Sequence, residues 1–307
     1  MRILVIAMVI ATPLVAIFGL RNDFLVFIAG IALIHMLWAS GLNLLYGFTG
    51  LIPLTYAGIA GISAYMTVHL VMRLGLSFWL ALPIGSAAAA LVGLLLSLPA
   101  IRLRGFYFAL SGMVIQSAFT IAFVYFPAYT NGDTGIASVP RPTGFDGGAI
   151  PSPYIECVLA LFVIAAVAGI GLTMRSRFGR TLITIREDED LARALGINVT
   201  LNRTAAFIIS SFIAGLGGGL YAHYIGFASP RAFDVLISLN LWLMVAMGGR
   251  GTLVGPLLGA LLLAPLPYLL VQYTWVKDVI YGVAIVLVTL FLPQGIYGFV
   301  LKRKART

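Results

Sequence analysis

The carboxylates and guanidinium groups of this chain are concentrated in one stretch, 179–199, which reads GRTLITIREDEDLARALGINV. Only 9% of the 307 residues are charged, so the run of four acidic residues at 187–190 is the first place to look for chemistry. Carboxylates can act as acid and base, or bind a metal ion, when suitable partners such as histidine or cysteine lie beside them. No histidine or cysteine lies in the stretch, so we expect the acidic run to start a helix rather than to form a catalytic cluster.

The other residues that could carry catalysis are isolated. The three histidines, His35, His69 and His223, lie in separate segments, and Cys157 is the single cysteine, which excludes an internal disulfide. The sequence contains no HExxH, GxSxG or GxxxxGK[ST] motif, so it cannot cradle nucleotide phosphates by itself. We therefore expect no enzyme activity, no metal and no directly bound cofactor. Any ATP and Mg would be used by a partner.

The order of charges in the stretch predicts a short helix over 187–195. The acidic residues would fill its first turn, where they interact favourably with the helix dipole, and Gly196 would cap its end after Arg193. Such a helix is roughly 13 Å long, far too short to cross a bilayer. Leu191 and Leu195 lie one turn apart and give it an apolar edge. Two interpretations remain open, a helix that docks on a cytoplasmic protein and a plain solvated loop.

The segments around this stretch are apolar enough to lie in a membrane. Apolar residues make up 61% of the chain and the mean hydropathy is +1.05, which is typical of an integral membrane protein. A helix needs roughly 20 apolar residues to cross the bilayer, so the sequence predicts an all-α polytopic protein with one domain, 1–307, and about ten spans. These are 3–20, 24–46, 54–72, 78–101, 106–126, 154–174, 204–227, 235–247, 253–272 and 278–298.

The lysines and arginines predict the orientation of the chain. Most of them fall on one side when both termini are placed in the cytoplasm, as the positive-inside rule requires. The loop 175–203 is then cytoplasmic and the loop 127–153 lies outside. Because the basic residues are scattered at the ends of spans, nucleic acid is not an expected partner. The apolar start could also be a cleavable signal peptide, but no small-residue cleavage motif follows it, which favours a first span.

Two of the predicted spans are irregular. The stretch 43–65 contains four glycines and Pro53, which predicts a broken helix of the kind that protein or a water-filled cavity must shield. The run 235–247 covers only about 20 Å. Either it borrows flanking residues to cross, or 228–255 forms a re-entrant or broken pair.

Loops and glycines add two weaker expectations. The loop 127–153 is rich in glycine and proline, and it could be a lid, a docking surface or a mere connector. Glycines that recur every four residues line one helical face and let a neighbouring helix approach closely. The glycines with this expected packing role are Gly215, Gly219, Gly251, Gly255 and Gly259.

The polar residues inside the spans are mostly neutral. A carrier driven by protons or sodium usually needs a buried carboxylate, and Glu156 lies near a span's outer end, so a stand-alone carrier or channel is disfavoured. Hydrogen bonding between helices explains any single neutral residue. Together they suit a path for an uncharged or zwitterionic solute, and the candidates are Asn43, Thr49, Thr55, Tyr56, Ser63, Gln116 and Thr120.

Four stretches of the sequence resemble LivM-type permeases, the membrane subunits of branched-chain amino-acid ABC importers. They are GRTLITIREDEDLARALGINVTLNRTAAFIISSFIAGLGGGLYAHY, RGFYFALSGMVIQ, TNGDTGIASVPRP and MGGRGTLVGPLLGA, in the family's order and over nearly the whole chain. The resemblance implies a multi-pass protein of the bacterial inner membrane. It also implies a sister permease, in a heterodimer, two cytoplasmic ATPase subunits and an extracellular substrate-binding protein as partners.

The resemblance also gives the charged stretch a role. In that family the helix of the cytoplasmic loop inserts into a cleft of the ATPase subunit, which would couple ATP hydrolysis to transport. The residues that this assigns to coupling are Arg180, Arg186, Glu187, Asp188, Leu191, Ala194, Leu195 and Gly196.

The chain departs from the family pattern where substrate choice would be decided. After the second span, 50–55 reads GLIPLT and lacks the usual Gln and Ser, and Gln116 stands where many members carry an acidic residue. Related permeases carry urea and short amides, so these solutes are an alternative to branched-chain or other hydrophobic amino acids.

Overall fold

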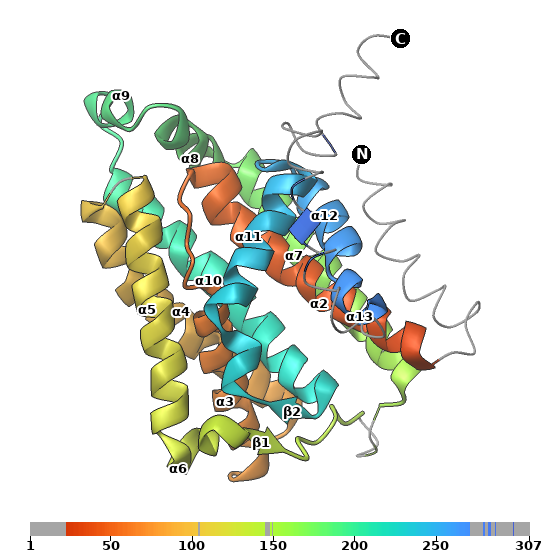
Figure 1. Cartoon of the computed structure of the whole chain (residues 1–307). Coiled ribbons are helices and arrows are strands. Elements are labelled where there is room, and N and C mark those ends of the chain that lie inside the picture. The colour runs from red at the N-terminus through yellow and green to blue at the C-terminus, as the bar shows by residue number, and fades with distance from the viewer. Residues whose placement is uncertain are drawn as a thin grey trace, which may run out of the picture.

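The computed structural model describes residues 23–103, 105–144, 148 and 150–270, together with positions 279, 282, 283, 286 and 297. Within these residues the chain is a bundle of helices with one pair of two-residue strands (Figure 1). The all-α prediction is therefore confirmed for this part of the chain. The predicted span 3–20 lies outside the described residues, as does 278–298 apart from the five positions just named.

Six helices in the described part are long and apolar enough to cross a membrane, which makes this a multi-pass membrane protein. Together with two shorter apolar segments, they coincide with the predicted spans from 24–46 to 253–272. The long helices are α2 (Asp23–Asn43), α4 (Phe78–Arg102), α5 (Phe106–Tyr125), α7 (Ser152–Arg175), α10 (Val199–Ile225) and α11 (Val235–Gly249). The first shorter segment is α3 (Tyr56–Met72), and the second consists of α12 (Gly255–Leu263) and α13 (Leu266–Leu269).

Helix α10 lies in the centre of the bundle and packs against α2, α3 and α4. Small residues let these backbones approach closely. A methyl group at Gly218 would overlap the carbonyl oxygen of Ala60 in α3, and one at Gly215 would lie 2.7 Å from Ser86 Cα in α4. Gly219 faces the flexible side chain of Leu82. Helices α4, α5 and α7 instead expose much of their apolar surface, as expected of faces in contact with lipid or another subunit.

Helix α2 ends in an irregular segment, as the glycines of 43–65 predict. It passes into the π-helix η1 (Leu44–Phe48), and the chain is then non-helical until α3 begins at Tyr56. Most of this connecting segment is buried, and it runs from the α8 end of the bundle toward the middle of the molecule (Figure 1). Non-helical backbone at this depth is tolerated because neighbouring helices shield it.

Helix α11 reaches a span's length by using flanking residues. The 3-10 turn η3 (Pro230–Phe233) precedes it, and the segment Pro230–Gly249 has 20 residues. The structure therefore agrees with the first of the two alternatives for 235–247. After α11 the chain turns back into α12, and α13 follows after a break at Pro265.

One glycine prediction is wrong. Gly251 does not share a helical face with Gly255 and Gly259, because α12 begins at Gly255 and Gly251 lies in the preceding turn with φ of 72°. Glycine is favoured there by the left-handed backbone, not by helix packing. Gly255 and Gly259 do pack closely, since a methyl group on either would overlap a carbonyl oxygen of α11.

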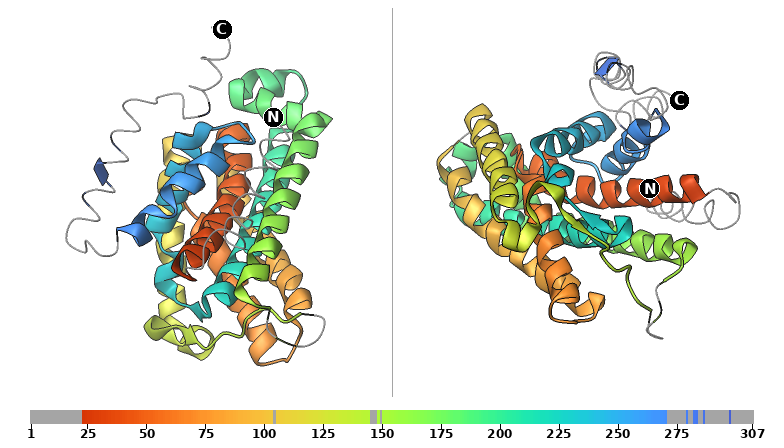
Figure 2. Two further views of the ribbon diagram at one scale, coloured as in Figure 1. Left: turned by 90° about the vertical axis from the view of Figure 1, so that its right-hand side faces the viewer. Right: turned by 60° about the horizontal axis from the view of Figure 1, so that its bottom comes forward.

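The loop 127–153 is held against the other end of the bundle. It contains α6 (Pro127–Thr130), the 3-10 turn η2 (Gly132–Thr134) and β1 (Ile136–Ala137), which pairs antiparallel with β2 (Phe227–Ala228) after α10. Arg73 Nη2 donates to the carbonyl of Ala128 at 2.6 Å, and Trp79 Nε1 donates to that of Thr143 at 2.8 Å. The loop runs across this end of the bundle (Figure 2, right). These hydrogen bonds fix the loop to the bundle, which agrees better with a fixed surface than with an open lid.

Candidate functional site

Helix α8 (Arg177–Glu187) is amphipathic and lies at one end of the bundle, directly after α7 (Figure 1). Ser176 separates the two helices, and its hydroxyl accepts from the backbone N–H of Gly179 at 3.4 Å, which marks a new helix start. Leu182 and Ile185 are buried, while Arg180 is exposed. The predicted cytoplasmic loop 175–203 therefore contains a helix before 187, which the apolar periodicity of this segment indicates.

The predicted helix 187–195 exists but begins later. Asp188 has an extended backbone and its Oδ1 accepts from the N–H of Leu191 at 2.9 Å, so it is the N-cap of α9 (Glu189–Ala194). Glu187 therefore ends α8 instead of starting the next helix. At the other end, Gly196 has φ of 79° and terminates α9 as predicted.

Helix α9 is fixed to the bundle by an ion pair and a small apolar contact. Glu189 accepts from Arg193 Nη2 at 2.7 Å within the helix, and from Arg203 Nη2 of α10 at 2.8 Å. Arg203 is buried, so this pair is shielded from solvent. On the same side, Ala192 packs against Ile185 and Val199 in a separate apolar cluster. Sequence reasoning assigned the acidic residues to the helix dipole alone and did not find the bond to α10.

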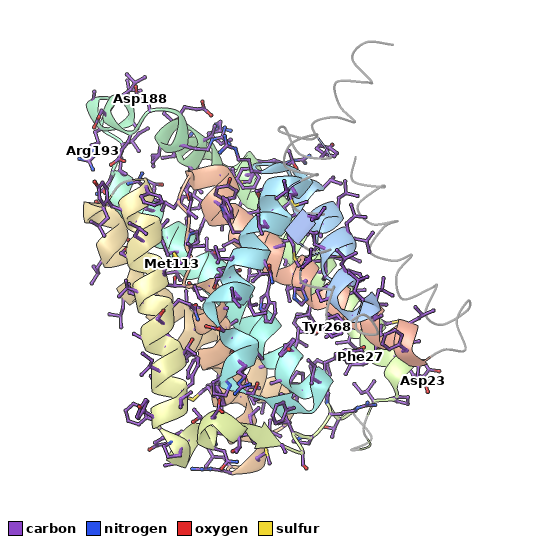
Figure 3. All side chains as sticks on the ribbon, in the orientation of Figure 1. Asp23, Phe27, Met113, Asp188, Arg193 and Tyr268 are labelled. Carbon is purple, nitrogen blue, oxygen red and sulfur yellow. The ribbon has the colours of Figure 1, made fainter. Side chains whose placement is uncertain are left out.

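The opposite edge of α9 has no cover in the described part of the chain. Leu191 is 54% exposed and Leu195 is 67% exposed, and Ala194 and Gly196 are exposed beside them. The helix lies at the far tip of the bundle, where Figure 3 labels Asp188 and Arg193. A rigidly attached helix with two exposed leucines one turn apart is a surface suited to bind another protein. We call these four residues the α9 edge.

Arg186 connects α8 to the irregular end of α2. Its Nη1 donates to the carbonyl of Gly47 in η1 at 2.7 Å, and its other nitrogens bind the carboxylate of Glu187. The Gly47 carbonyl is one of the last in its helix and has no partner further along it. Arg186 also contacts Gly50, and its side chain lies close to Gly251 in the turn before α12.

Asn43 joins the same region from the end of α2. Its Nδ2 donates to the carbonyl of Thr252 at 2.8 Å, and its Oδ1 accepts from the N–H of Gly251 at 2.9 Å. The end of α2, the last residues of α8 and the turn between α11 and α12 are thus held together. We call Asn43, Gly47, Arg186, Gly251 and Thr252 the junction.

A cavity of about 500 Å³ lies beside the junction. Hydrogen bonding and the positive charge of Arg186, with a further contribution from Arg250, lower the pKa of the Glu187 carboxyl. The lining of the cavity therefore includes one carboxylate and two guanidinium groups. Its lining residues are Tyr46, Gly50, Ile52, Arg186, Glu187 and Arg250.

The predicted pathway residues lie mostly inside the chain's own core. Gln116 illustrates this: its Oε1 accepts from the N–H of Gly58 at 2.8 Å and its Nε2 donates to the carbonyl of Phe233 at 2.7 Å. Ser238 accepts from the N–H of Ala57 at 2.9 Å. Gln116 and Ser238 together therefore accept hydrogen bonds from two backbone N–H groups in the first turn of α3, which have no partner within the helix. Gln116 is therefore explained by helix capping at the broken segment.

The other candidates are similar. Tyr56 donates to the carbonyl of Ser210 at 3.2 Å, and Thr49 donates to that of Leu45. Thr120, which donates to the carbonyl of Gln116 at 3.2 Å, is the one member of the set that is partly exposed. The fully buried members are Asn43, Thr49, Thr55, Tyr56, Ser63 and Gln116.

The fold defines a multi-pass membrane protein, and the site places a small, firmly attached helix with two exposed leucines at one end of its bundle. Comparison with known proteins agrees. The family described as "Branched-chain amino acid transport system / permease component" matches residues 24–289. The chain belongs to this family and is a permease component of a branched-chain amino acid ABC transport system. Permease subunits of this class have no ATPase activity of their own.

Individual relatives extend the comparison. The chain is 32% identical over 292 residues to the high-affinity branched-chain amino acid transport system permease protein LivM of Escherichia coli K12, covering 88% of this chain and 69% of that protein. It is 25% identical over 282 residues to LivH of Salmonella typhimurium, covering 86% and 91%. The autoinducer 2 import system permease protein LsrC of Klebsiella pneumoniae is 32% identical over 142 residues, covering 44% and 40%. No solved structure matches the chain.

Proposed function

We propose that this chain is one of two membrane subunits of an ATP-driven importer for branched-chain or other hydrophobic amino acids. The α9 edge docks one of two cytoplasmic ATPase subunits, which bind ATP and Mg and hydrolyse the nucleotide. A sister permease completes the pathway, and a substrate-binding protein delivers the solute from outside. The observation that carries this proposal is the exposure of Leu191 and Leu195 on a helix that is otherwise fixed to the bundle.

The structure supports a physical route for coupling. Force applied to α9 reaches α10 through the ion pair of Glu189 with Arg203, and it reaches the broken end of α2 through the bond of Arg186 with Gly47. The segment after η1 is non-helical and can change its conformation at less cost than a continuous helix. Movement of the ATPase subunits would thereby be transmitted to the segment that shapes the pathway.

The pathway lies between the two permeases, so residues at its surface must be accessible from outside the chain's core. Helix α5 meets this condition because few of its residues are buried, and Thr120 is the predicted pathway residue that is partly exposed on it. The buried polar residues act instead by holding the broken helix in shape. Both termini and the α9 edge lie in the cytoplasm of a bacterial cell whose inner membrane holds the transporter.

The docking claim is tested by replacing Leu191 and Leu195 together with Asp. A charged side chain on the docking edge is costly to bury against the partner, so docking should be weakened. We therefore expect substrate uptake to fall at least tenfold while the purified permease stays folded. Uptake by whole cells, and recovery of ATPase subunits with the tagged permease, measure the effect. Leu74→Asp is the matched control, because Leu74 is 69% exposed in the turn after α3, at the opposite end of the bundle. Uptake by the double variant equal to that of the control would contradict docking.

The substrate is tested separately on the cognate substrate-binding protein. Binding of leucine, isoleucine and valine, and no binding of urea or short amides, is the expected result, with aromatic amino acids as a further comparison. Binding of urea or amides alone would contradict the amino-acid assignment while leaving the docking claim intact.

A further inference from the structure

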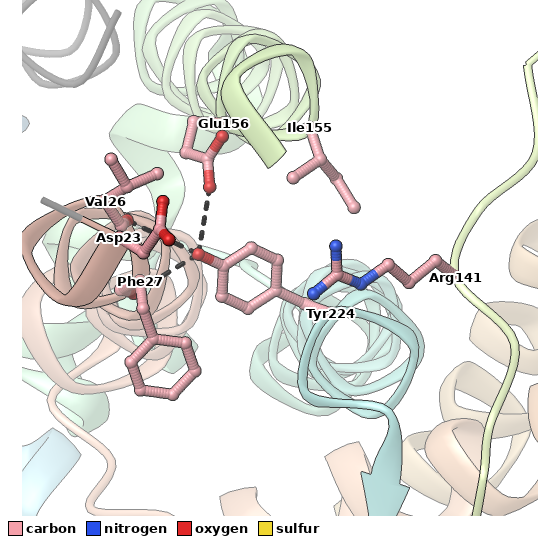
Figure 4. Close-up of a pocket in the computed structure, with 7 residues that line it drawn as sticks. All are labelled: Asp23, Val26, Phe27, Arg141, Ile155, Glu156 and Tyr224. Carbon is pink, nitrogen blue, oxygen red and sulfur yellow. Dashed lines mark hydrogen bonds between the residues drawn. The ribbon is translucent and has the colours of Figure 1, made fainter. Parts of the chain in front are cut away.

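A second cavity, of about 270 Å³, lies at the end of the bundle opposite α9. It is formed where α2 begins, α7 begins and α10 ends, with one residue from the loop 127–153. Figure 4 shows the side chains of Asp23, Glu156 and Arg141 around the ring of Tyr224. Val26, Phe27 and Ile155 complete the lining.

Glu156 is the unusual member of this lining. Its side chain is fully buried, its Oε1 accepts from the hydroxyl of Tyr224 at 3.0 Å, and its Oε2 has no hydrogen-bond partner in the described residues. A buried carboxylate is costly unless its oxygens are paired and hydrogen-bonded. Neither the coupling site nor the proposed pathway uses this residue. The free oxygen of a residue that lines the cavity points to a missing donor.

The Tyr224 hydroxyl cannot also donate a hydrogen bond to Glu156 Oε2. Its single proton is shared among Glu156 Oε1 and the carbonyls of Val26 and Phe27, which lie at 3.4 and 3.3 Å. Arg141 interacts electrostatically with Glu156 but leaves Oε2 without a hydrogen bond. A ligand with several N–H donors would supply the hydrogen bond that Glu156 Oε2 lacks.

The charges select the kind of ligand. A bare metal ion does not fit, because no group of three or more His, Cys, Asp and Glu side chains among the described residues could hold one, and the guanidinium of Arg141 would repel it. Two carboxylates and one guanidinium instead complement a molecule that carries an ammonium group and an anionic group. At roughly 30 Å³ per water molecule, the cavity has room for a small polar group of this kind.

We propose that this cavity binds a zwitterion with a primary ammonium group. The ammonium donates to Glu156 Oε2 and to Asp23, and the anionic group faces Arg141. Two sources offer this chemistry, the headgroup of phosphatidylethanolamine and a free amino acid. The proposal does not depend on ATPase docking, because the cavity and the α9 edge lie at opposite ends of the bundle.

The experiment uses the full chain, purified with the subunits that accompany it and stripped of lipid. Retention of phosphatidylethanolamine and of phosphatidylcholine is measured by native mass spectrometry, and binding of O-phosphoethanolamine, phosphocholine and L-leucine by calorimetry. The choline compounds are the matched controls, because their quaternary ammonium has no N–H to donate. We expect the primary ammonium compounds to bind at least tenfold more tightly than the choline compounds, and Glu156→Gln to remove that preference.

The arms of the experiment distinguish the sources. Retained phosphatidylethanolamine with no leucine binding identifies a lipid site, and leucine binding that phosphoethanolamine displaces identifies a solute site. Asp133→Asn is the control variant, since it removes a carboxylate at the same end that pairs with Arg231 and does not line the cavity. If Glu156→Gln does not fold, Asp23→Asn at the exposed rim is measured in its place, with a smaller loss expected. Equal binding of ammonium and choline compounds, or an unchanged preference in the folded variant, overturns the proposal.

Discussion

Arg186 shows how one side chain can join two segments that are distant in the sequence, α8 and η1. Its guanidinium donates to the carbonyl of Gly47 and to the carboxylate of Glu187 at the same time, which requires a planar group with several N–H donors. Lysine has the same charge but a single nitrogen on a flexible chain. The geometry of the junction, and not its charge alone, therefore depends on arginine.

Arg186→Lys tests this geometry. We expect the variant to keep its ATPase partners, because the α9 edge is unchanged, and to lose transport by about tenfold, because the bond to the broken end of α2 is weakened. Uptake and ATPase activity measured on the same membranes separate the two effects. Arg231→Lys serves as the control, since Arg231 is an exposed arginine that pairs with Asp133, at 3.2 Å, at the opposite end of the bundle. Full uptake by Arg186→Lys would show that the junction does not transmit the motion.

At the scale of elements, the bundle is held together by close approaches that only glycine permits. Helices α10 and α3 meet where Gly218 lies against the backbone of Ala60. Backbone atoms cannot rotate away as a flexible side chain can, so the whole helix must shift to admit one methyl group. The crossing of α10 and α3 matters for function because α3 follows the broken segment directly.

Gly218→Ala is expected to destabilise the bundle by roughly 1–3 kcal/mol. Gly169→Ala in α7 is the matched control, because a methyl group there meets open space and alanine favours a helix over glycine by about 1 kcal/mol. Thermal unfolding of the two purified variants in the same detergent gives the comparison. Equal midpoints would show that the α10 and α3 contact is less tight than the structure indicates.

Sequence alone could identify the elements that depend on local pattern. The spans follow from apolar length, the break after α2 from glycine and proline, and the end of α9 from Gly196. What it could not give are bonds between distant residues. Arg186 and Gly47 are 139 positions apart and carry no periodic signal. Likewise, neutral polar residues such as Gln116 look alike whether they line a path or cap a buried helix, and only the fold shows the capping bonds.

At the scale of the whole molecule, the ends of the bundle differ in a way that predicts its orientation. The α9 end carries Arg175, Arg177, Arg180, Arg186, Arg193, Arg203 and Arg250, whereas the described residues of the other end carry fewer arginines, Arg73, Arg141 and Arg231. Insertion favours an excess of basic residues in the cytoplasm. The α9 end should therefore face the cytoplasm, which is also where ATPase subunits would dock.

Single cysteines report this orientation directly. Cys157 is the one cysteine of the chain, so Cys157→Ala gives a background that thiol reagents do not label. In that background we expect Asp133→Cys to react with a membrane-impermeant maleimide in intact spheroplasts. Ala194→Cys should react only after the membrane is opened, because both positions are exposed but lie at opposite ends of the bundle. Labelling of Ala194→Cys from outside would reverse the orientation, and the α9 edge could then no longer meet a cytoplasmic ATPase.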